Sequence, residues 1–166
     1  MNTSIEYLKI IIGDTQETIR AYDTKAEVLG IILTLSTAIT NFGAIASINQ
    51  PVSCWLKCSW IFALLATLAC ALVLLPRKNP FKGMMLNGYI PSGVFYLEKI
   101  LQTPKSHTEL KKKIAETQWE DELLYEAMKL SIIRESKCRW VDVALYLTTA
   151  TISFILIHIV FQFFIK

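Results

Sequence analysis

The sequence predicts an all-α membrane protein with three transmembrane helices and a cytosolic helical bundle. Three nearly uncharged segments, 28–48, 55–75 and 141–165, each supply the ~20 helical residues that span the roughly 30 Å hydrocarbon core of a bilayer. The chain is 53% hydrophobic over its 166 residues, and its mean hydropathy is +0.41. This composition is too apolar for an ordinary soluble domain of that size.

Residues 1–27 predict a cytosolic amphipathic helix. Thr3 to Glu6 have the spacing of a capping box, which satisfies the first backbone N–H groups of a helix. Side chains that suit a packed face then recur at three- and four-residue steps: Ile5, Leu8, Ile12, Thr15, Ile19 and Tyr22. No proline separates this helix from the first span, and its acidic residues argue against a cleaved signal peptide.

The first predicted span, 28–48, has two unlike faces. One carries Gly30, Thr34, Thr37 and Asn41, and the other carries Val28, Ile31, Ile32, Leu35, Ile39 and Phe42. In lipid, small and hydroxylated residues mark the places where helices touch, so we expect the apolar face to meet lipid. The polar stripe has two interpretations: a helix contact within one chain, or, together with Thr149 and Ser153, the lining of a wet path in an oligomer.

An external turn over 49–54 leads to the second predicted span, 55–75. A stripe of small residues on this span is suited to packing against the first span: Ser59, Ala63, Ala66 and Cys70. Cys54 and Cys58 have no histidine or acidic residue beside them, so we interpret the cysteines as small apolar side chains and predict no metal site.

Residues 76–140 predict a cytosolic helical segment. It contains a short helix over 92–102, and a second capping box, 106–109, opens a helix with Leu110 and Ile114 inside. From Trp119 an apolar pattern runs without a break into the third span, 141–165. The acidic run 120–122 is interpreted as a solvated helix face.

The distribution of Lys and Arg predicts the topology. Residues 1–26 hold three of them, residues 77–140 hold twelve, and the remaining two are Lys57 and Lys166. The positive-inside bias therefore places the N-terminus and 77–140 in the cytosol and the C-terminus on the outer side of the membrane.

Charged residues cluster where the chain enters the membrane. Asp23, Lys25 and Glu27 precede the first span, and Asp142 lies one residue inside the third. They have two interpretations: an interface anchor with an ion pair to a neighbouring helix, or a latch whose rearrangement shifts the spans. The candidate partners of the latch are Arg134, Lys137 and Arg139.

Basic residues gather at the cytosolic surface of the predicted membrane. The ligand-binding candidates among them are Arg77, Lys78, Arg134, Lys137 and Arg139. Anionic lipid headgroups are one partner for such a cluster. The phosphate of a small anionic ligand is the other, because the planar guanidinium of arginine matches phosphate oxygens.

Several classes of function lack support in the sequence. The chain has no Gly-rich phosphate loop ending in Lys-Ser/Thr and no G-x-S-x-G elbow, so we expect neither an enzyme nor a bound cofactor. The net charge of +3 is too small to suggest a nucleic-acid partner.

The order of these parts resembles the Pycsar transmembrane effectors, and the related SLATT membrane effectors share the layout. The resemblance rests on short motifs along nearly the whole chain. They are Asp23-Thr24-Lys25-Ala26 before the first span, the basic stop at Pro76-Arg77, Phe95-Tyr96 in the short cytosolic helix, and Lys137-Cys138-Arg139-Trp140 before the last span.

This resemblance implies an antiphage role by abortive infection. A partner uridylate or cytidylate cyclase would make cyclic UMP or cyclic CMP, and the effector would sense that messenger and impair the inner membrane, killing the cell. Nothing in this chain indicates a separate β-rich nucleotide-binding domain, so sensing would fall to the helical cytosolic segment. We also expect homo-oligomers, because three spans enclose no water path. The alternative is a non-enzymatic membrane anchor or scaffold for a cytosolic partner, bound through 92–140.

Overall fold

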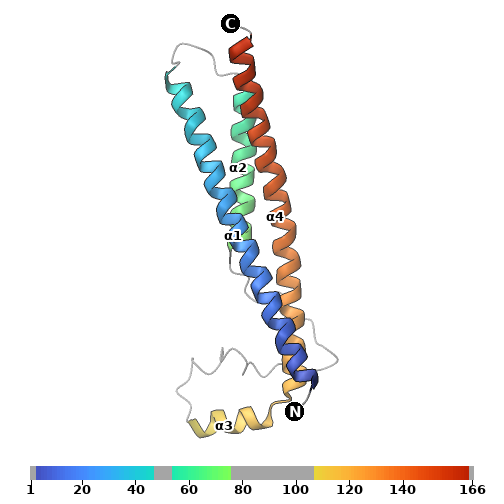
Figure 1. Ribbon diagram of the computed structural model, residues 1–166. Coiled ribbons are helices and arrows are strands. Elements are labelled where there is room, and N and C mark those ends of the chain that lie inside the picture. Colours follow the sequence, from blue (N-terminus) through green and yellow to red (C-terminus); the bar gives the residue numbers. More distant parts are fainter. Residues whose placement is uncertain (1–2, 47–53, 76–106, 165–166) are drawn as a thin grey trace. The chain divides into compact units, whose positions relative to one another are not determined.

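The computed structural model describes residues 3–46, 54–75 and 107–164, and nearly all of these residues are helical (Figure 1). The elements are α1 (Thr3–Ala46), α2 (Cys54–Leu74), α3 (His107–Glu116) and α4 (Trp119–Phe164). The described chain therefore confirms the all-α prediction. The predicted short helix over 92–102 and most of the external turn lie outside the described residues.

The chain divides into two compact units, and the boundary between them cuts through both long helices. Unit 1 comprises residues 1–18 and 77–134, and unit 2 comprises 19–76 and 135–166. The predicted amphipathic helix and first span form one uninterrupted helix, α1, because no proline or glycine pair breaks its hydrogen bonding.

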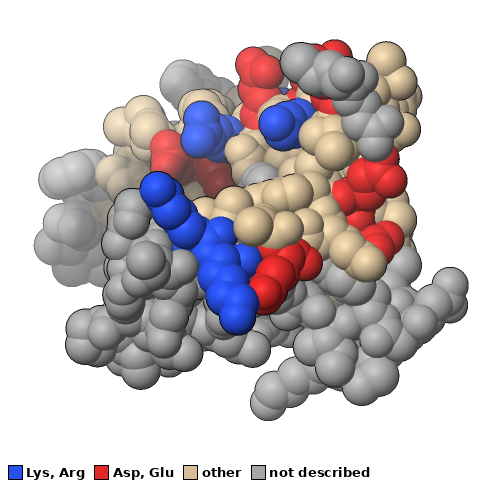
Figure 2. All heavy atoms as spheres, turned by 90° about the horizontal axis from the view of Figure 1, so that it is seen from below, with Lys and Arg blue, Asp and Glu red and all other residues tan. Residues whose placement is uncertain are grey.

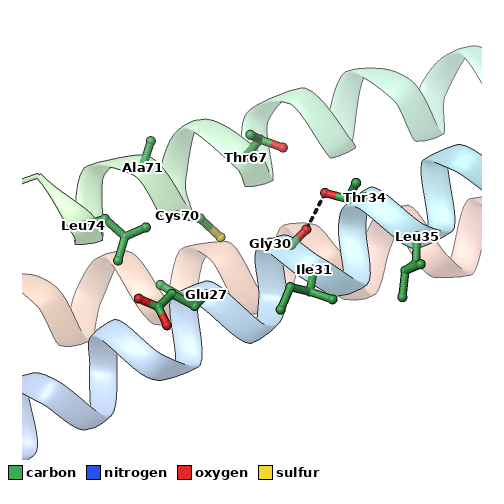
Figure 3. A pocket seen from close by; sticks show the side chains of 10 residues that line it. Glu27, Gly30, Ile31, Thr34, Leu35, Thr67, Cys70, Ala71 and Leu74 are labelled. Atoms are coloured by element: carbon green, nitrogen blue, oxygen red, sulfur yellow. Dashed lines mark hydrogen bonds between the residues drawn. The ribbon is translucent and has the colours of Figure 1, made fainter.

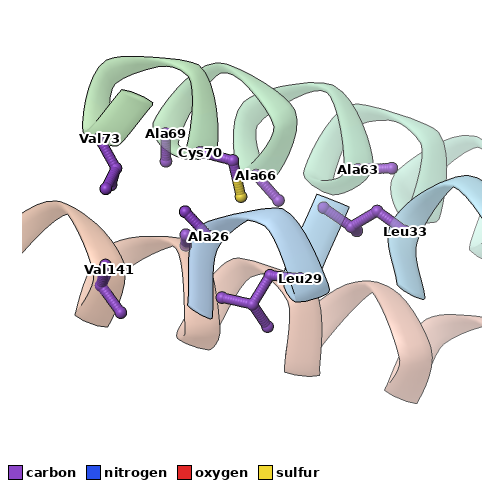
Figure 4. Packing of buried hydrophobic residues seen from close by; sticks show 10 residues of the cluster. Ala26, Leu29, Leu33, Ala63, Ala66, Ala69, Cys70, Val73 and Val141 are labelled. Atoms are coloured by element: carbon purple, nitrogen blue, oxygen red, sulfur yellow. The ribbon is translucent and has the colours of Figure 1, made fainter. Parts of the chain in front are cut away.

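The core of unit 2 is a seam between α1, α2 and α4 built mainly from small side chains (Figure 4). The small-residue stripe expected on α2 lies fully in this seam: Ser59, Ala63, Ala66 and Cys70 are all buried. Alanine and serine allow helix backbones to approach closely, which is how helices gain packing energy when lipid offers no hydrophobic drive. Figure 4 shows Ala26 and Leu33 of α1 on the side of α2, and Leu29 beside α4.

The contact face of α1 differs from the one expected. Ala26, Leu29 and Leu33 are buried, whereas Thr34 and Asn41 are exposed and Thr37 is half-buried. The polar stripe therefore lies to one side of the packed seam, because leucine and alanine fill the space between helices better than threonine does. The apolar face of α1 is exposed as expected, at Val28, Ile31, Ile32, Leu35 and Ile39.

Two described helices are long and apolar enough to cross a membrane, α2 over Cys54–Leu74 and α4 over Trp119–Gln162. Only 39% and 17% of their most apolar stretches are buried, whereas the core helix of a soluble protein is mostly buried. Such a continuous exposed apolar surface requires lipid or protein to cover it. The first predicted span extends beyond the described side chains of α1, so a third crossing remains a proposal.

An aromatic cluster joins α2 to α4 near the start of α2. The ring of Trp55 lies 6.0 Å from that of Phe154 and 6.1 Å from that of Phe161. Phe62 stacks on Phe154 at 5.2 Å. These distances are within the range at which aromatic pairs attract each other beyond simple burial.

The expected apolar stripe of α1 is buried or half-buried at every position from Ile5 to Tyr22, and its fully buried members, Ile12 and Thr15, lie in unit 1. Leu123 and Leu130 of α4 are buried as well. Two expectations for this region are wrong. Ile114 is exposed, because the ten-residue α3 ends at Glu116 and a break precedes Trp119. Glu122 is fully buried, although Glu120 and Asp121 beside it are solvated.

Candidate functional site

The structure brings together two of the charged residues that precede the spans. Lys137 Nζ of α4 and Asp23 Oδ1 of α1 form an ion pair within unit 2. The Lys137 side chain is only 9% exposed and that of Asp23 is 32% exposed. The carboxylate of Asp23 therefore compensates for the water that the lysine ammonium loses on burial. Two aromatic residues close to this ion pair in the sequence pack against the apolar seam. They are Tyr22, next to Asp23, and Trp140, three residues after Lys137.

The other charged residues of this cluster are more accessible. Arg139 pairs with Glu135 one turn away on its own helix, and the Lys25 ammonium lies 5.6 Å from the ring centre of Tyr22. Glu27 is exposed. Figure 2 shows acidic and basic side chains of the described residues on the face seen from below, with neither sign alone covering it.

Three of the five basic ligand-binding candidates lie in the described part of the chain. Arg77 and Lys78 lie outside the described residues. Arg134 and Arg139 are exposed, as a phosphate contact requires, whereas Lys137 is buried against Asp23. Lys137 therefore belongs to both predicted sets, the ligand-binding residues and the latch.

The hydroxyl groups of the predicted polar stripes bond to their own helices. Thr34 donates to the Gly30 carbonyl at 2.8 Å and Thr37 to the Leu33 carbonyl at 2.8 Å. In α4, Thr149 donates to the Leu145 carbonyl at 2.9 Å, and Ser153 to the carbonyl of Thr149, also at 2.9 Å. Because each hydroxyl proton is already used, these residues need no water or partner helix to satisfy them.

A groove of about 700 Å³ lies between α1 and α2 in unit 2. Figure 3 shows Gly30 and Thr34 on one wall and Thr67 and Cys70 on the other, with Glu27 nearer one end. The remaining lining residues are apolar: Ala26, Ile31, Leu35, Ala71 and Leu74. The wide opening and apolar lining suit an acyl chain or a helix better than a cyclic nucleotide, which needs several polar contacts.

Sequence reasoning missed a buried polar group in unit 1. Glu126 of α4 is 4% exposed, and its Oε1 lies 3.5 Å from Lys129 Nζ. Glu122, one turn earlier, is 0% exposed. The burial of Glu126 could have been predicted from its spacing, because Leu123, Glu126 and Leu130 share the apolar face of the helix. No group of three histidine, cysteine or acidic side chains within the described part of the chain is placed to hold a metal ion.

Comparison with known proteins identifies the family. The profile of the Pycsar effector protein domain (PycTM) matches residues 7–164, which include the described helices apart from the first four residues of α1. The chain belongs to the Pycsar effector family. No curated protein and no solved structure matches this chain.

Pycsar effectors are antiphage proteins activated by cyclic nucleotides that partner cyclases make. PycTM effectors generally act on membranes without catalysis. Both properties agree with a chain whose two most apolar helices expose most of their surface.

Proposed function

We propose that this Pycsar effector senses cyclic CMP or cyclic UMP from a partner cyclase and impairs the bacterial inner membrane as a homo-oligomer. The outward apolar faces of α1, α2 and α4 support this proposal best. A soluble protein rarely exposes a contiguous apolar patch of more than a few hundred Å². Lipid is the partner that covers such faces on three neighbouring helices at once.

The proposed topology has three crossings, at 28–48, 55–75 and 141–165. The N-terminus and 76–140 lie in the cytoplasm and the C-terminus lies in the periplasm. The uninterrupted α1 supports the first crossing, because its exposed residues from Val28 to Ile39 are apolar apart from Thr34, whose hydroxyl bonds to its own helix. A reporter fused after Lys166 that is active only in the periplasm tests this orientation, and cytoplasmic activity of that reporter contradicts it.

The proposed trigger involves Lys137. An anionic phosphate that reaches this lysine competes with the carboxylate of Asp23, because both anions draw on the N–H donors of the same ammonium. Binding would then weaken a contact between α1 and α4 next to the membrane and release the packing of the spans. The proposed phosphate contacts also include the exposed Arg134 and Arg139, together with Arg77 and Lys78 outside the described residues.

The deciding experiment uses the full chain in proteoliposomes or in intact cells with a potential-sensitive dye. We expect depolarisation on adding cyclic CMP or cyclic UMP, and none with cyclic AMP or with linear CMP. Arg134→Ala should require more nucleotide for the same response, whereas Lys112→Ala on α3 serves as the matched control because its side chain is 77% exposed and pairs only with Glu116 among described residues. An unchanged potential at saturating nucleotide contradicts the proposal and favours the anchor function, which predicts a stable complex with a cytosolic protein and no toxicity.

A further inference from the structure

The outward face of α4 differs from those of the two other helices in unit 2. On α1 that face carries Ile31, Leu35 and Ile39, and on α2 it carries Leu64 and Leu68, all exposed and all apolar. Both faces are suited to lipid. Over 31–39 of α1 and 64–68 of α2, neither face carries a carboxylate or a phenol.

A polar stripe runs along the outward side of α4 over three helical turns, beside exposed apolar residues such as Leu145 and Leu156. Asp142, Tyr146, Thr149 and Ser153 are all exposed. At 100° per residue they lie roughly 160° around the helix from the packed seam. That seam contains the buried residues Val141, Ala144, Thr148 and Thr151.

Two of these side chains are poorly satisfied by the residues that the structure describes. Tyr146 is 75% exposed, and its hydroxyl has no hydrogen-bond partner among the described residues. The Asp142 carboxylate receives a thiol contact from Cys138 at 3.9 Å, which is far weaker than a normal hydrogen bond to a carboxylate. A carboxylate and a phenol on a lipid-facing surface are costly, so this face requires a protein or water neighbour.

The charges on the same face suggest which neighbour fits. Glu135, Arg139 and Asp142 alternate in sign at steps of four and three residues. Copies inserted in the same orientation hold equivalent residues at the same depth. An arginine on one copy therefore lies within one helical turn of an acidic residue on the other. The small Thr149 and Ser153 above them permit close approach of two helices.

We propose that copies of this chain assemble through this stripe, α4 against α4, with Arg139 of one copy paired to Asp142 of the next. The inference rests on the membrane insertion stated under the proposed function, but it needs neither the nucleotide nor the loss of membrane potential. Assembly on this face buries the polar stripe and leaves the apolar faces of α1 and α2 in lipid. In this arrangement α4, and not the Thr34 stripe of α1, forms the contact between copies.

Disulfide crosslinking in membranes tests the interface. In a background without the four native cysteines, the variants Thr149→Cys and Ser153→Cys are oxidised in the bilayer. Leu35→Cys and Leu64→Cys are matched controls, because these leucines are as outward-facing, at 59% and 63% exposure. We expect at least tenfold more disulfide-linked dimer at Thr149 or Ser153 than at either control. Equal dimer at the controls, or no dimer at either α4 position, overturns the proposal.

A charge exchange tests the pairing itself. Arg139→Asp should reduce the Ser153→Cys dimer at least fivefold, because acidic residues then face one another. Adding Asp142→Arg should restore it, and failure to restore it contradicts the pairing. Carbonate extraction separates the two proposals: a chain that leaves the membrane pellet overturns both. An inserted chain that depolarises membranes without crosslinking through α4 overturns only the interface.

Discussion

The ion pair between Asp23 and Lys137 leads to an asymmetric prediction about stability. The lysine side chain is 9% exposed and the aspartate 32%. Asp23→Ala leaves a buried ammonium without its counter-ion, whereas Lys137→Met leaves an aspartate that water already reaches. The two substitutions remove the same contact and should nevertheless differ in cost.

The magnitude lies between two known limits. A surface ion pair contributes about 0–1 kcal/mol, and breaking a buried one costs about 3–5 kcal/mol. With one buried partner and one that is a third exposed, we expect Asp23→Ala to lower the free energy of unfolding by about 2 kcal/mol. Lys137→Met should cost less than about 1 kcal/mol, and the double variant should be more stable than Asp23→Ala alone.

The assay is thermal unfolding of the purified chain in detergent. For a chain of this size about 2 kcal/mol corresponds to a midpoint lower by roughly 4–8 °C. If the pair also acts as a latch, Asp23→Ala should partly depolarise cells in the absence of nucleotide. Two results would refute the reasoning. One is an equal loss in the free energy of unfolding for Lys137→Met and Asp23→Ala, and the other is a loss in the double variant that equals the sum of the two single losses.

Four further substitutions, one of them a control, test the packing. Ala66→Leu should overfill the seam between α1 and α2 and cost about 1–3 kcal/mol in a denaturant titration, whereas Leu68→Ala on the outward face should stay within about 0.5 kcal/mol. Leu123→Ala should open a cavity in unit 1 and cost about 2–5 kcal/mol, seen as faster proteolysis of 107–134. Trp55→Ala should remove its stacking on Phe154 and a second phenylalanine, with a loss of about 1 kcal/mol, seen as a lower melting midpoint.

Periodicity predicted the helices and much of the packing of this protein. The small residues of α2, from Ser59 to Cys70, are buried because only small side chains allow helices to approach, and that requirement is visible in their spacing. The apolar face of α1 was predictable for the same reason. The continuous α1 follows from the absence of a helix breaker before Ala46.

Sequence reasoning failed where a polar residue shares a face with apolar ones. Thr34 and Thr37 suggested a helix contact, but Leu29 and Leu33 fill the seam instead, and the threonine hydroxyls bond to carbonyls of their own helix. Composition cannot show whether a hydroxyl is satisfied locally or across an interface. Glu122 illustrates the converse, because its acidic neighbours suggested solvent and only the fold shows its burial.

The candidate site was predictable only as a set of alternatives. Charge and position indicated that Asp23 would meet one of several basic residues, and the structure selects Lys137. Arg139 was an equal candidate by sequence, but it lies on the outward side of α4 and pairs with Glu135. The difference is one of helix angle: Lys137 shares a face with Val141 and Ala144, whereas Arg139 lies about 200° further around the helix.

The position of this ion pair suggests why a costly charge lies in the seam. Small residues repeat along the contact face of α2, so packing alone distinguishes poorly between neighbouring registers of the helices. A single buried pair makes one register much better than the others, since any shift of α4 along α1 leaves the ammonium of Lys137 without a carboxylate. The same property suits a switch: an anion that satisfies Lys137 in place of Asp23 removes the preference for the resting register. Stability would then change little while the freedom of α4 to move increases, as expected of an effector that must stay harmless until its messenger arrives.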